Sequence, residues 1–206
     1  MRAIPRSLRW LSALLLATTL AALSAPPASA KTGTLFDGRS LKGWRHAGTA
    51  TFEVKNRTLR TVPGAGQLGL LYYARKTYRD FELTLQFRAA EGANSGVHLR
   101  FPKPGGCSWI DCGYEVQVND TAADPRKTGS IYGFADLDAT KAHARPANTW
   151  GRLTIRAKGQ TYTVYRDGKR INRYVGSRRR TGYVGLQAHG GPQDSVAFRA
   201  IRIRAL

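Results

Sequence analysis

The sequence predicts an all-β domain in which two antiparallel sheets pack face to face. Apolar and polar residues alternate with a period of two along many short segments, most clearly in DFELTLQF at positions 80–87, whereas apolar residues at helical spacing are nearly absent. Clusters of Gly, Pro, Asn and Asp, as in FPKPGG and TAADPRKTG, separate these segments. About a dozen short strands in roughly 170 residues is typical of an antiparallel sandwich or barrel. We favour a sandwich in which the outer surface of one sheet is free to hold a ligand.

Residues 1–30 have the pattern of a secretory signal peptide. Three arginines precede an apolar run over residues 11–23, and Ala28-Ser29-Ala30 supplies the small residues of a cleavage site. We therefore expect cleavage after Ala30, a secreted protein, and one domain over residues 31–206. No Cys follows the cleavage site directly, and no later stretch is long and apolar enough to span a bilayer, so we expect no membrane anchor.

The stretch LFDGRSLKGW, residues 35–44, opens the predicted domain. Leu35 and Phe36 are apolar, Asp37-Gly38 favours a turn, and Trp44 closes the segment. We expect it to form the first strand and a turn that docks Trp44 onto the sandwich. A ligand contact from Asp37 or Trp44 is the alternative.

The remaining strands follow from the alternation and from the breaks. In DFELTLQF the apolar residues from Phe81 to Phe87 share one face, which we expect to lie in the core. Residues 161–174 are typical of a hairpin in which Asp167-Gly168 forms a type I′ turn. Further strands are expected at 50–54, 57–61, 69–73, 96–101, 114–119, 130–134, 151–157, 182–188 and 196–204.

Two cysteines, Cys107 and Cys112, lie close together in GCSWIDCG. Outside the cytosol such a pair is expected to form a small disulfide loop. A metal site would need further soft ligands nearby, and the surrounding sequence offers none.

The positive charge of the chain is large. Three of the 33 basic residues and none of the 13 acidic ones precede position 31, which leaves 30 basic and 13 acidic side chains and a net charge of +17. Such a charge attracts anionic polymers, nucleic acid or membrane surfaces. The basic residues are scattered along many strands, however, and SRRR at 177–180 is the only dense run. We therefore expect no specific nucleic-acid partner, and an anionic cell-wall polymer stays an alternative partner.

Several predicted strands carry long polar side chains opposite their core residues. Because residues two apart share a face, we expect Val97, Leu99 and Phe101 in the core and His98 and Arg100 on the outer face. Buried sugar hydroxyls each need a hydrogen-bond partner, which carboxylate, amide, imidazole, guanidinium and phenol groups supply. The alternative is an ordinary solvated face. The candidate ligand face comprises His98, Arg100, Glu115, Gln117, Tyr132, Gln187 and His189.

Ordinary glycoside hydrolysis does not fit this set of residues. That reaction usually needs two carboxylates across the scissile bond, and Glu115 is the only acid that the alternation places firmly on the candidate face. The chain also has no E-x-D-x-x-E run, no serine nucleophile elbow, no phosphate loop and no H-E-x-x-H zinc helix.

Seven blocks of the sequence resemble, in order, those of one known family. They are LFDGRSLKGW, DFELTLQFRAAEGANSGVHLR, GYEVQVND, TGSIYGF, NTWGRLTI, RTGYVGLQAHG and VAFRAIRIRAL, and together they span residues 35–206. The chain is thereby similar to the 3-keto-disaccharide hydrolase domain family. This resemblance implies the jelly-roll sandwich of the concanavalin A-like lectins and glucanases. Two positions depart from the family pattern: His98 stands where an apolar or aromatic residue is usual, and Ala200 stands where F-R-N-I has Asn.

The resemblance implies a substrate glycoside that is already oxidised at C3 of a hexose ring. A C3 ketone acidifies the C2 hydrogen, so a base can remove it, the enolate can expel the C1 substituent, and water can add to the resulting glycal. Such a site needs one base, an acid for the leaving oxygen, and donors at the enolate oxygen, with no carboxylate pair.

On this chain the resemblance favours Glu115 or His189 as the base and Arg100 or a bound divalent cation as the stabiliser of the enolate. No cofactor is otherwise expected. Arg199, whose strand should carry a bulge, is a further substrate-binding candidate, and Trp109 in the disulfide loop is expected to shape the rim of the cleft. The expected partner is an oligosaccharide or glycoside. A non-catalytic carbohydrate-binding module and a cationic protein that binds cell-wall polyanions are the two alternative functions.

Overall fold

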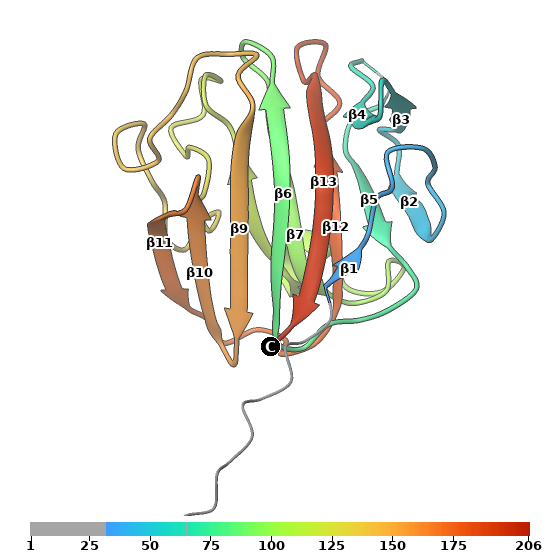
Figure 1. The fold of residues 1–206 in the computed structure, drawn as a ribbon, viewed down its shortest axis with the longest axis vertical. Helices are drawn as coiled ribbons and strands as arrows, with labels where there is room; N and C mark the ends of the chain where they lie inside the picture. The colour runs from blue at the N-terminus through green and yellow to red at the C-terminus, as the bar shows by residue number, and fades with distance from the viewer. Residues whose placement is uncertain (1–31, 65) are drawn as a thin grey trace, which may run out of the picture.

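The computed structural model describes residues 32–64 and 66–206, so the predicted signal peptide lies outside the described residues. Two antiparallel sheets form a sandwich (Figure 1), which confirms the predicted fold class. The larger sheet has eight strands in the order β11-β10-β9-β6-β13-β4-β3, with β1 paired to β13, and the smaller has five in the order β2-β5-β12-β7-β8.

The strands of the larger sheet are β1 (Gly33–Thr34), β3 (Phe52–Lys55), β4 (Thr58–Thr61), β6 (Phe81–Ala89), β9 (Gly151–Lys158), β10 (Thr161–Arg166), β11 (Lys169–Val175) and β13 (Val196–Ala205). Those of the smaller sheet are β2 (Trp44–Gly48), β5 (Gly69–Tyr73), β7 (Ser95–Phe101), β8 (Tyr114–Val118) and β12 (Tyr183–Ala188). A short helix, α1 (Trp109–Cys112), is the only α-helix among the described residues. It is too short to cross a membrane, and no described helix has the length and hydropathy for that.

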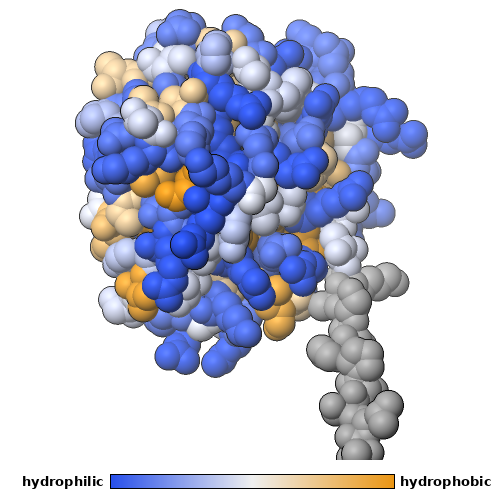
Figure 2. Space-filling model, turned by 60° about the vertical axis from the view of Figure 1, so that its left-hand side comes forward, coloured by the Kyte–Doolittle hydropathy of each residue, from blue (hydrophilic) through white to orange (hydrophobic). Residues whose placement is uncertain are grey.

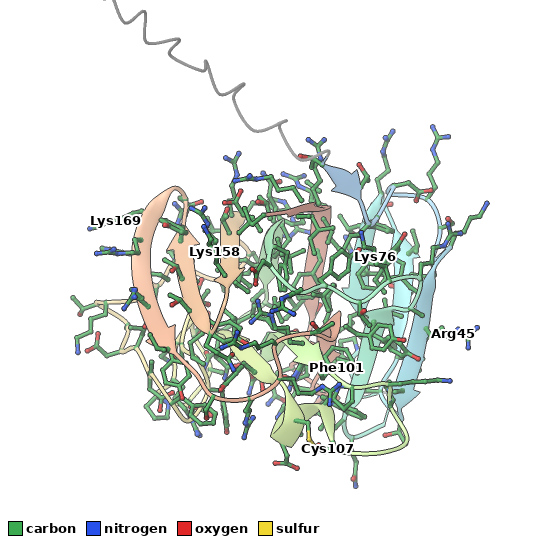
Figure 3. The ribbon with its side chains drawn as sticks, turned by 90° about the horizontal axis from the view of Figure 1, so that it is seen from below. Arg45, Lys76, Phe101, Cys107, Lys158 and Lys169 are labelled. Atoms are coloured by element: carbon green, nitrogen blue, oxygen red, sulfur yellow. A yellow bond between two sulfur atoms is a disulfide. The ribbon has the colours of Figure 1, made fainter. Side chains whose placement is uncertain are left out.

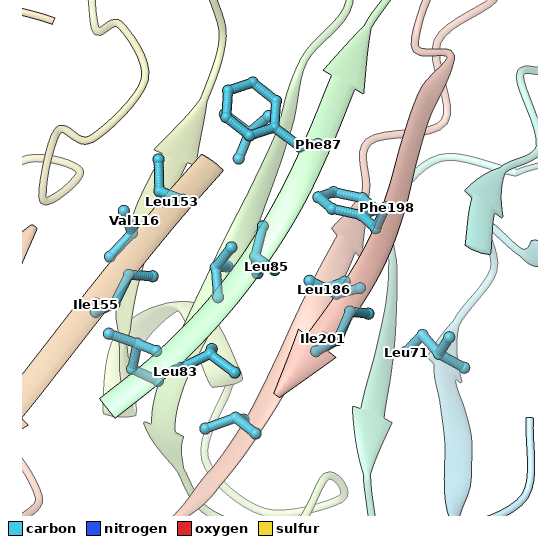
Figure 4. Close-up of a cluster of buried hydrophobic side chains, with 14 of the residues drawn as sticks. Leu71, Leu83, Leu85, Phe87, Val116, Leu153, Ile155, Leu186, Phe198 and Ile201 are labelled. Atoms are coloured by element: carbon cyan, nitrogen blue, oxygen red, sulfur yellow. The ribbon is translucent and has the colours of Figure 1, made fainter. Parts of the chain in front are cut away.

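The core lies between the sheets and contains the apolar face predicted for β6. Phe81, Leu83, Leu85 and Phe87 are all at most 2% exposed, and they pack with residues from both sheets, such as Ile155 of the larger and Val116 of the smaller (Figure 4). Burial of each such side chain contributes roughly 1.5–3 kcal/mol relative to exposure.

The predicted hairpin is present as β10 and β11. Asp167 and Gly168 both have positive φ, at 49° and 90°, as a type I′ turn requires. One predicted strand is absent: residues 130–134 form only isolated bridges through Ile131, because the chain turns back there and Ile131 and Ala135 bond to each other. The prediction also missed the short strands β1 and β2.

The LFDGRSLKGW stretch closes the fold as a clasp. The indole Nε1 of Trp44 donates to the Leu35 carbonyl at 2.8 Å, and the Leu35 N–H donates to the Ile201 carbonyl at 2.9 Å. The Asp37 carboxylate accepts from the backbone N–H groups of Arg39 and Ser40 and so fixes the turn. The docking of Trp44 is as predicted, but the stretch connects β1 to β2, whose first residue is Trp44, and does not itself form the first strand.

The expected bulge in β13 is present, and its geometry explains why Asn is usual at position 200, where this chain has Ala. The register with β6 shifts between Arg199 and Arg202, and Ala200 has a φ of 51°. This left-handed conformation costs an L-residue with a Cβ roughly 1–2 kcal/mol, and Asn adopts it more readily than Ala.

We therefore expect Ala200→Asn to raise the free energy of unfolding by about 0.5–1 kcal/mol, since position 200 is exposed and the change disturbs no core contact. Urea denaturation measures the difference. The control is Ala205→Asn, an exposed position of the same strand without positive φ, which should gain nothing. If the free energy of unfolding of Ala200→Asn is no higher than that of Ala205→Asn, the positive φ at position 200 does not cost stability as argued.

Candidate functional site

A polar cleft lies on the outer face of the smaller sheet, beside α1. Its volume is about 200 Å³, and its lining includes five of the predicted residues together with other residues: Leu68, Asn94, Ile110, Glu115, Gln117, Asp124, Tyr132, Gln187 and His189. Glu115 and Gln117 come from β8 and Gln187 from β12, where each alternates with a buried core residue. The alternation of the strands thus brings Glu115 and His189 to one cleft, although they are far apart in sequence.

Strand β7 lies between β8 and β12 and leaves space for the Glu115 side chain. In the register, His98 is opposite Glu115 and Gly96 is opposite Gln117. A Cβ at Gly96 would overlap the carboxylate of Glu115, so only glycine accommodates that side chain here. With its amide turned toward the acceptors, Gln117 donates to Glu115 Oε1 at 3.1 Å and to the Ser95 carbonyl at 2.8 Å.

Glu115 is the acidic group in the cleft whose pKa is raised close to neutral pH. Burial of the carboxyl, together with the nearby negative charge of Asp124, raises its pKa to about 7. The Gln187 amide and the Arg126 guanidinium act in the opposite direction and offset only part of this. A carboxyl group that titrates near neutral pH can both accept and donate a proton under ordinary conditions.

His189 is oriented by a carboxylate that the sequence analysis missed. Its Nδ1 lies 2.9 Å from Asp194 Oδ2, and the Asp194 side chain is 1% exposed while that of His189 is 49% exposed. Asp194 is itself fixed, because its oxygens accept from the backbone N–H groups of Asn94 and Gly191 at 2.8 Å. Occupation of Nδ1 by Asp194 leaves Nε2 as the nitrogen that can exchange a proton with a ligand.

A second missed carboxylate, Asp124, lines the cleft from the loop after β8. Arg126 binds it through two bonds, from Nε to Oδ1 at 2.8 Å and from Nη2 to Oδ2 at 2.9 Å. The same guanidinium lies 4.0 Å over the ring of Tyr132. Arg126 also lowers the pKa of Asp124, so this carboxylate stays ionised. Sequence reasoning treated TAADPRKTG only as a break between strands.

His98 lies beneath the cleft and does not line it, which corrects its prediction as a substrate ligand. It is fully buried, and burial lowers its pKa to about 3, an effect that the Trp109 backbone offsets only in part. The imidazole is therefore neutral, and its 3.8 Å approach to Glu115 Oε2 is not an ion pair. Its Nε2 lies 3.4 Å from the Gln187 amide nitrogen, so it supports that side chain from below.

The prediction for Arg100 is wrong. Arg100 sits at a bulge, where the register of β7 with β12 shifts and φ is 52°, so its side chain turns into the interior and is fully buried. Phe101 takes the outer face instead, where it packs with Leu70 and Tyr72. Arg199 is also excluded from the cleft, because it projects from the outer face of the larger sheet, where it bonds to Gln86.

Trp109 packs against the outer cluster of Leu70, Tyr72 and Phe101, and its neighbour Ile110 forms the cleft wall. Cys107 and Cys112 form the predicted disulfide, which brackets α1. Phe101 and Cys107 lie on the same side of the sandwich (Figure 3). Among residues 32–64 and 66–206, no group of three or more His, Cys, Asp or Glu side chains is arranged to hold a metal ion.

Comparison with known proteins identifies the family. The model of the 3-keto-alpha-glucoside-1,2-lyase-like domain matches residues 31–204 of the chain. The chain belongs to this family. A 3-keto-disaccharide hydrolase from Bacteroides thetaiotaomicron is 22% identical over 231 aligned positions, which cover 84% of this chain and 78% of that protein.

Solved structures resemble this member of the 3-keto-alpha-glucoside-1,2-lyase-like family in fold. A Parabacteroides distasonis protein provisionally described as a glycosyl hydrolase superposes with a TM-score of 0.72 at 17% identity, covering 85% of this chain and 94% of that one. The carbohydrate-binding module CBM66 of Bacillus subtilis superposes with a TM-score of 0.59 at 14% identity, covering 79% and 96%. The fold is therefore the jelly-roll sandwich of lectins and carbohydrate-binding modules.

We expect Gly96→Ala to lower any activity or ligand affinity of this cleft by about tenfold or more, because the added methyl displaces the Glu115 carboxylate from its place over β7. Turnover and binding of a keto-disaccharide measure the effect. Gly106→Ala is the matched control, since a Cβ there meets no atom within 4 Å. Equal behaviour of the two folded variants would show that the position of Glu115 over Gly96 has no role in the cleft.

Proposed function

We propose that this protein cleaves 3-keto-glycosides by elimination and hydration in the cleft of the smaller sheet. The observation that supports the proposal best is the pairing of Glu115, whose pKa is about 7, with the Asp194-oriented His189 in one cleft of a 3-keto-alpha-glucoside-1,2-lyase-like domain. Such a pair supplies a base and an acid without the two opposed carboxylates of ordinary glycosidases.

In the proposed reaction Glu115 takes the C2 hydrogen as a proton, and the electron pair of that bond forms the enolate with C3. The enolate then reforms the ketone, the C1–O bond breaks, and His189 protonates the departing oxygen. Water adds to C1 of the unsaturated product while C2 regains a proton, which yields the free 3-keto sugar and the released alcohol. The Gln187 amide and the Tyr132 hydroxyl, which line the cleft, are the donors that we assign to the enolate oxygen in place of Arg100.

The test is to incubate the protein with a 3-keto-disaccharide and with its unoxidised parent, each with and without a chelator. We expect cleavage of the keto compound only, since the parent has no acidified C2 hydrogen. Loss of turnover with chelator would assign enolate stabilisation to a divalent cation. Binding of either sugar without any product would support a non-catalytic carbohydrate-binding module instead.

The proposed role of Glu115 predicts the pH dependence of the reaction. A base must be ionised, so the acidic limb of the kcat/KM profile should rise with pH, with a midpoint near 7. Asp124→Asn should move this midpoint to lower pH, because the negative charge of Asp124 raises the pKa of Glu115. An acidic limb with the same midpoint in Asp124→Asn would show that the rise does not report the ionisation of Glu115.

We also propose that the protein works outside the cytosol. The signal-peptide pattern of residues 1–30 and the Cys107–Cys112 disulfide both support this location. N-terminal sequencing of the protein from the culture medium should begin at Lys31.

A further inference from the structure

The outer face of the larger sheet carries an array of basic side chains, which we call the arginine face. It is formed by the outward positions of three adjacent strands, β6, β9 and β13. Glu82 is the only acidic residue in these strands. The basic residues of the arginine face are Arg88, Arg152, Arg156, Lys158, Arg199, Arg202 and Arg204.

The strand register orders these side chains in rows across the sheet. One row joins Arg152, Gln86 and Arg199, and the next joins Thr154, Thr84 and Arg202. Neighbouring strands lie about 4.8 Å apart, so cations two strands apart are roughly 10 Å from each other, which is about one Debye length at physiological salt. Their fields therefore add over the face.

Few of these charges are neutralised. Glu82 pairs with Arg204 of the same face at 2.9 Å, and Asp167 pairs with Arg145 at 2.8 Å. Among the described residues, no carboxylate oxygen lies within 4.0 Å of the guanidinium nitrogens of Arg152, Arg199 or Arg202. These three are thus available to an anionic ligand.

Arg199 is also held in place before any ligand arrives. Its Nε donates to Gln86 Oε1 at 2.7 Å, and its guanidinium lies 3.9 Å from the centre of the Trp150 ring. Arg88 lies 5.1 Å from the same ring. A guanidinium that is already fixed loses less side-chain entropy when it binds a ligand.

Two grooves run through the arginine face and meet at the bulge of β13. One, of about 430 Å³, is lined by Thr84, Gln86, Arg152, Arg202 and Arg204, among others. The other, of about 460 Å³, is lined by Arg57, Arg199, Arg202 and the turn residue Asp37, among others. Ala200 and Arg202 belong to both grooves, so a long ligand can pass from one to the other.

We propose that the arginine face binds an anionic polysaccharide whose acidic groups are carboxylates. The planar fork of Arg matches a carboxylate with two parallel hydrogen bonds. The hydroxyl and amide groups of Thr84, Thr154 and Gln86, interleaved with the arginines, suit the sugar hydroxyls between the acidic groups. None of the large hydrophobic side chains that are exposed among the described residues belongs to β6, β9 or β13, which disfavours a lipid surface as the occupant. The neighbouring surface on the side of β10 and β11 is also mostly hydrophilic (Figure 2).

The arginine face and the cleft belong to different sheets, so one molecule can hold both ligands at once. Bound through the larger sheet to an acidic polysaccharide, the protein would keep its cleft open. This binding is independent of the proposed reaction and can be tested even if no keto-glycoside is cleaved.

The test measures binding of the full chain to polygalacturonate, with pullulan as the neutral polysaccharide. The variant R152Q/R199Q/R202Q is compared with R39Q/R45Q/R180Q, which removes the same charge from exposed arginines outside the arginine face. Because the first variant removes three guanidinium groups that can each make charge-assisted hydrogen bonds to a carboxylate, it should lose at least about tenfold in affinity. The second should lose much less, pullulan should not bind, and salt should weaken the binding.

Equal losses in the two variants would overturn the proposal, since net charge alone would then explain the binding. Tighter binding to duplex DNA or to phosphatidylglycerol vesicles at matched charge would overturn it as well. Circular dichroism of both variants guards against misfolding.

Discussion

Glu115→Gln is expected to lower the turnover of a 3-keto-disaccharide by roughly two or more powers of ten and to change its affinity only modestly. Gln keeps the shape of the side chain and much of its hydrogen-bonding capacity toward Gln117 and Gln187, but it cannot take up a proton. The loss should therefore appear in kcat and hardly in KM, as expected for a group that acts mainly in the transition state.

The same substitution should not unfold the protein, and the sign of this effect follows from the pKa of Glu115. The fold raises that pKa from 4.5 to about 7, so the folded state disfavours the ionised carboxyl. Below pH 4.5 the carboxyl is protonated in both states and does not change the free energy of unfolding. As the pH rises from 4.5 to about 7 the free energy of unfolding falls, and above pH 7 it is lower by an amount on the order of 3 kcal/mol. Glu115→Gln removes this cost, so its midpoint of denaturation at pH 8 should equal or exceed that of the unmodified protein.

The control for this experiment is Asp111→Asn, which removes an exposed carboxylate from α1 without touching the lining of the cleft. It should keep full turnover. Full activity in Glu115→Gln would transfer the role of the base to His189 or to a metal-bound water. Loss of stability together with loss of activity would leave Glu115 a merely structural role.

The candidate site could be predicted from sequence wherever strands keep their alternation. The alternation of apolar and polar residues predicted that Glu115 and Gln117 lie on the outer face of β8 and Gln187 on that of β12. All three line the cleft. The rule failed at the bulge of β7, because an extra residue in a strand exchanges the two faces of the residues that follow. Arg100 therefore points inward and Phe101 outward. No local signal in VHLRF marks that bulge, since the bonds that hold it come from distant segments.

Loop residues were beyond prediction for a different reason. Asp124 lines the cleft and Asp194 bonds to His189, but both lie in loops, and alternation carries no information about loops. Weak signals did exist. Glycine in the middle of a strand marks a close approach of another group, and Gly96 has the Glu115 carboxylate over it. Asp194 follows His189 by five residues across a glycine turn, which is a short enough connection for the two side chains to meet.

Arg100→Leu is expected to destabilise the fold by about 3–5 kcal/mol, the cost of removing one partner from a buried ionic network. The guanidinium donates to the Gly159 carbonyl at 2.6 Å, to the Tyr162 hydroxyl at 3.2 Å, to Asp80 Oδ1 at 3.0 Å and to the Arg79 carbonyl. It thus ties β7 of one sheet to the segments that flank β6 and β10 of the other. Such a loss is a large fraction of the 5–15 kcal/mol that stabilises a typical domain.

Leucine cannot replace these bonds, and its shorter side chain leaves the carbonyls of Arg79 and Gly159 without their donor. The loss of its bond to Arg100 costs Asp80 less free energy, because its carboxylate is 30% exposed and accepts from the Gly159 N–H as well. Most of the destabilisation should therefore come from the two orphaned carbonyls and the cavity between the sheets. Arg45→Leu, on an exposed position of β2, is the matched control and should change stability by no more than about 0.5 kcal/mol.

Turnover measurements on Arg100→Leu separate this structural role from the substrate-binding role that the sequence suggested. If Arg100 only joins the sheets, the variant that remains folded at low temperature should keep its kcat and KM, since the guanidinium is fully buried and does not line the cleft. Its denaturation midpoint alone should fall. A variant with unchanged stability and a raised KM would instead return Arg100 to the ligand face. The conclusion that the Arg100 side chain points inward at the bulge of β7 would then be wrong.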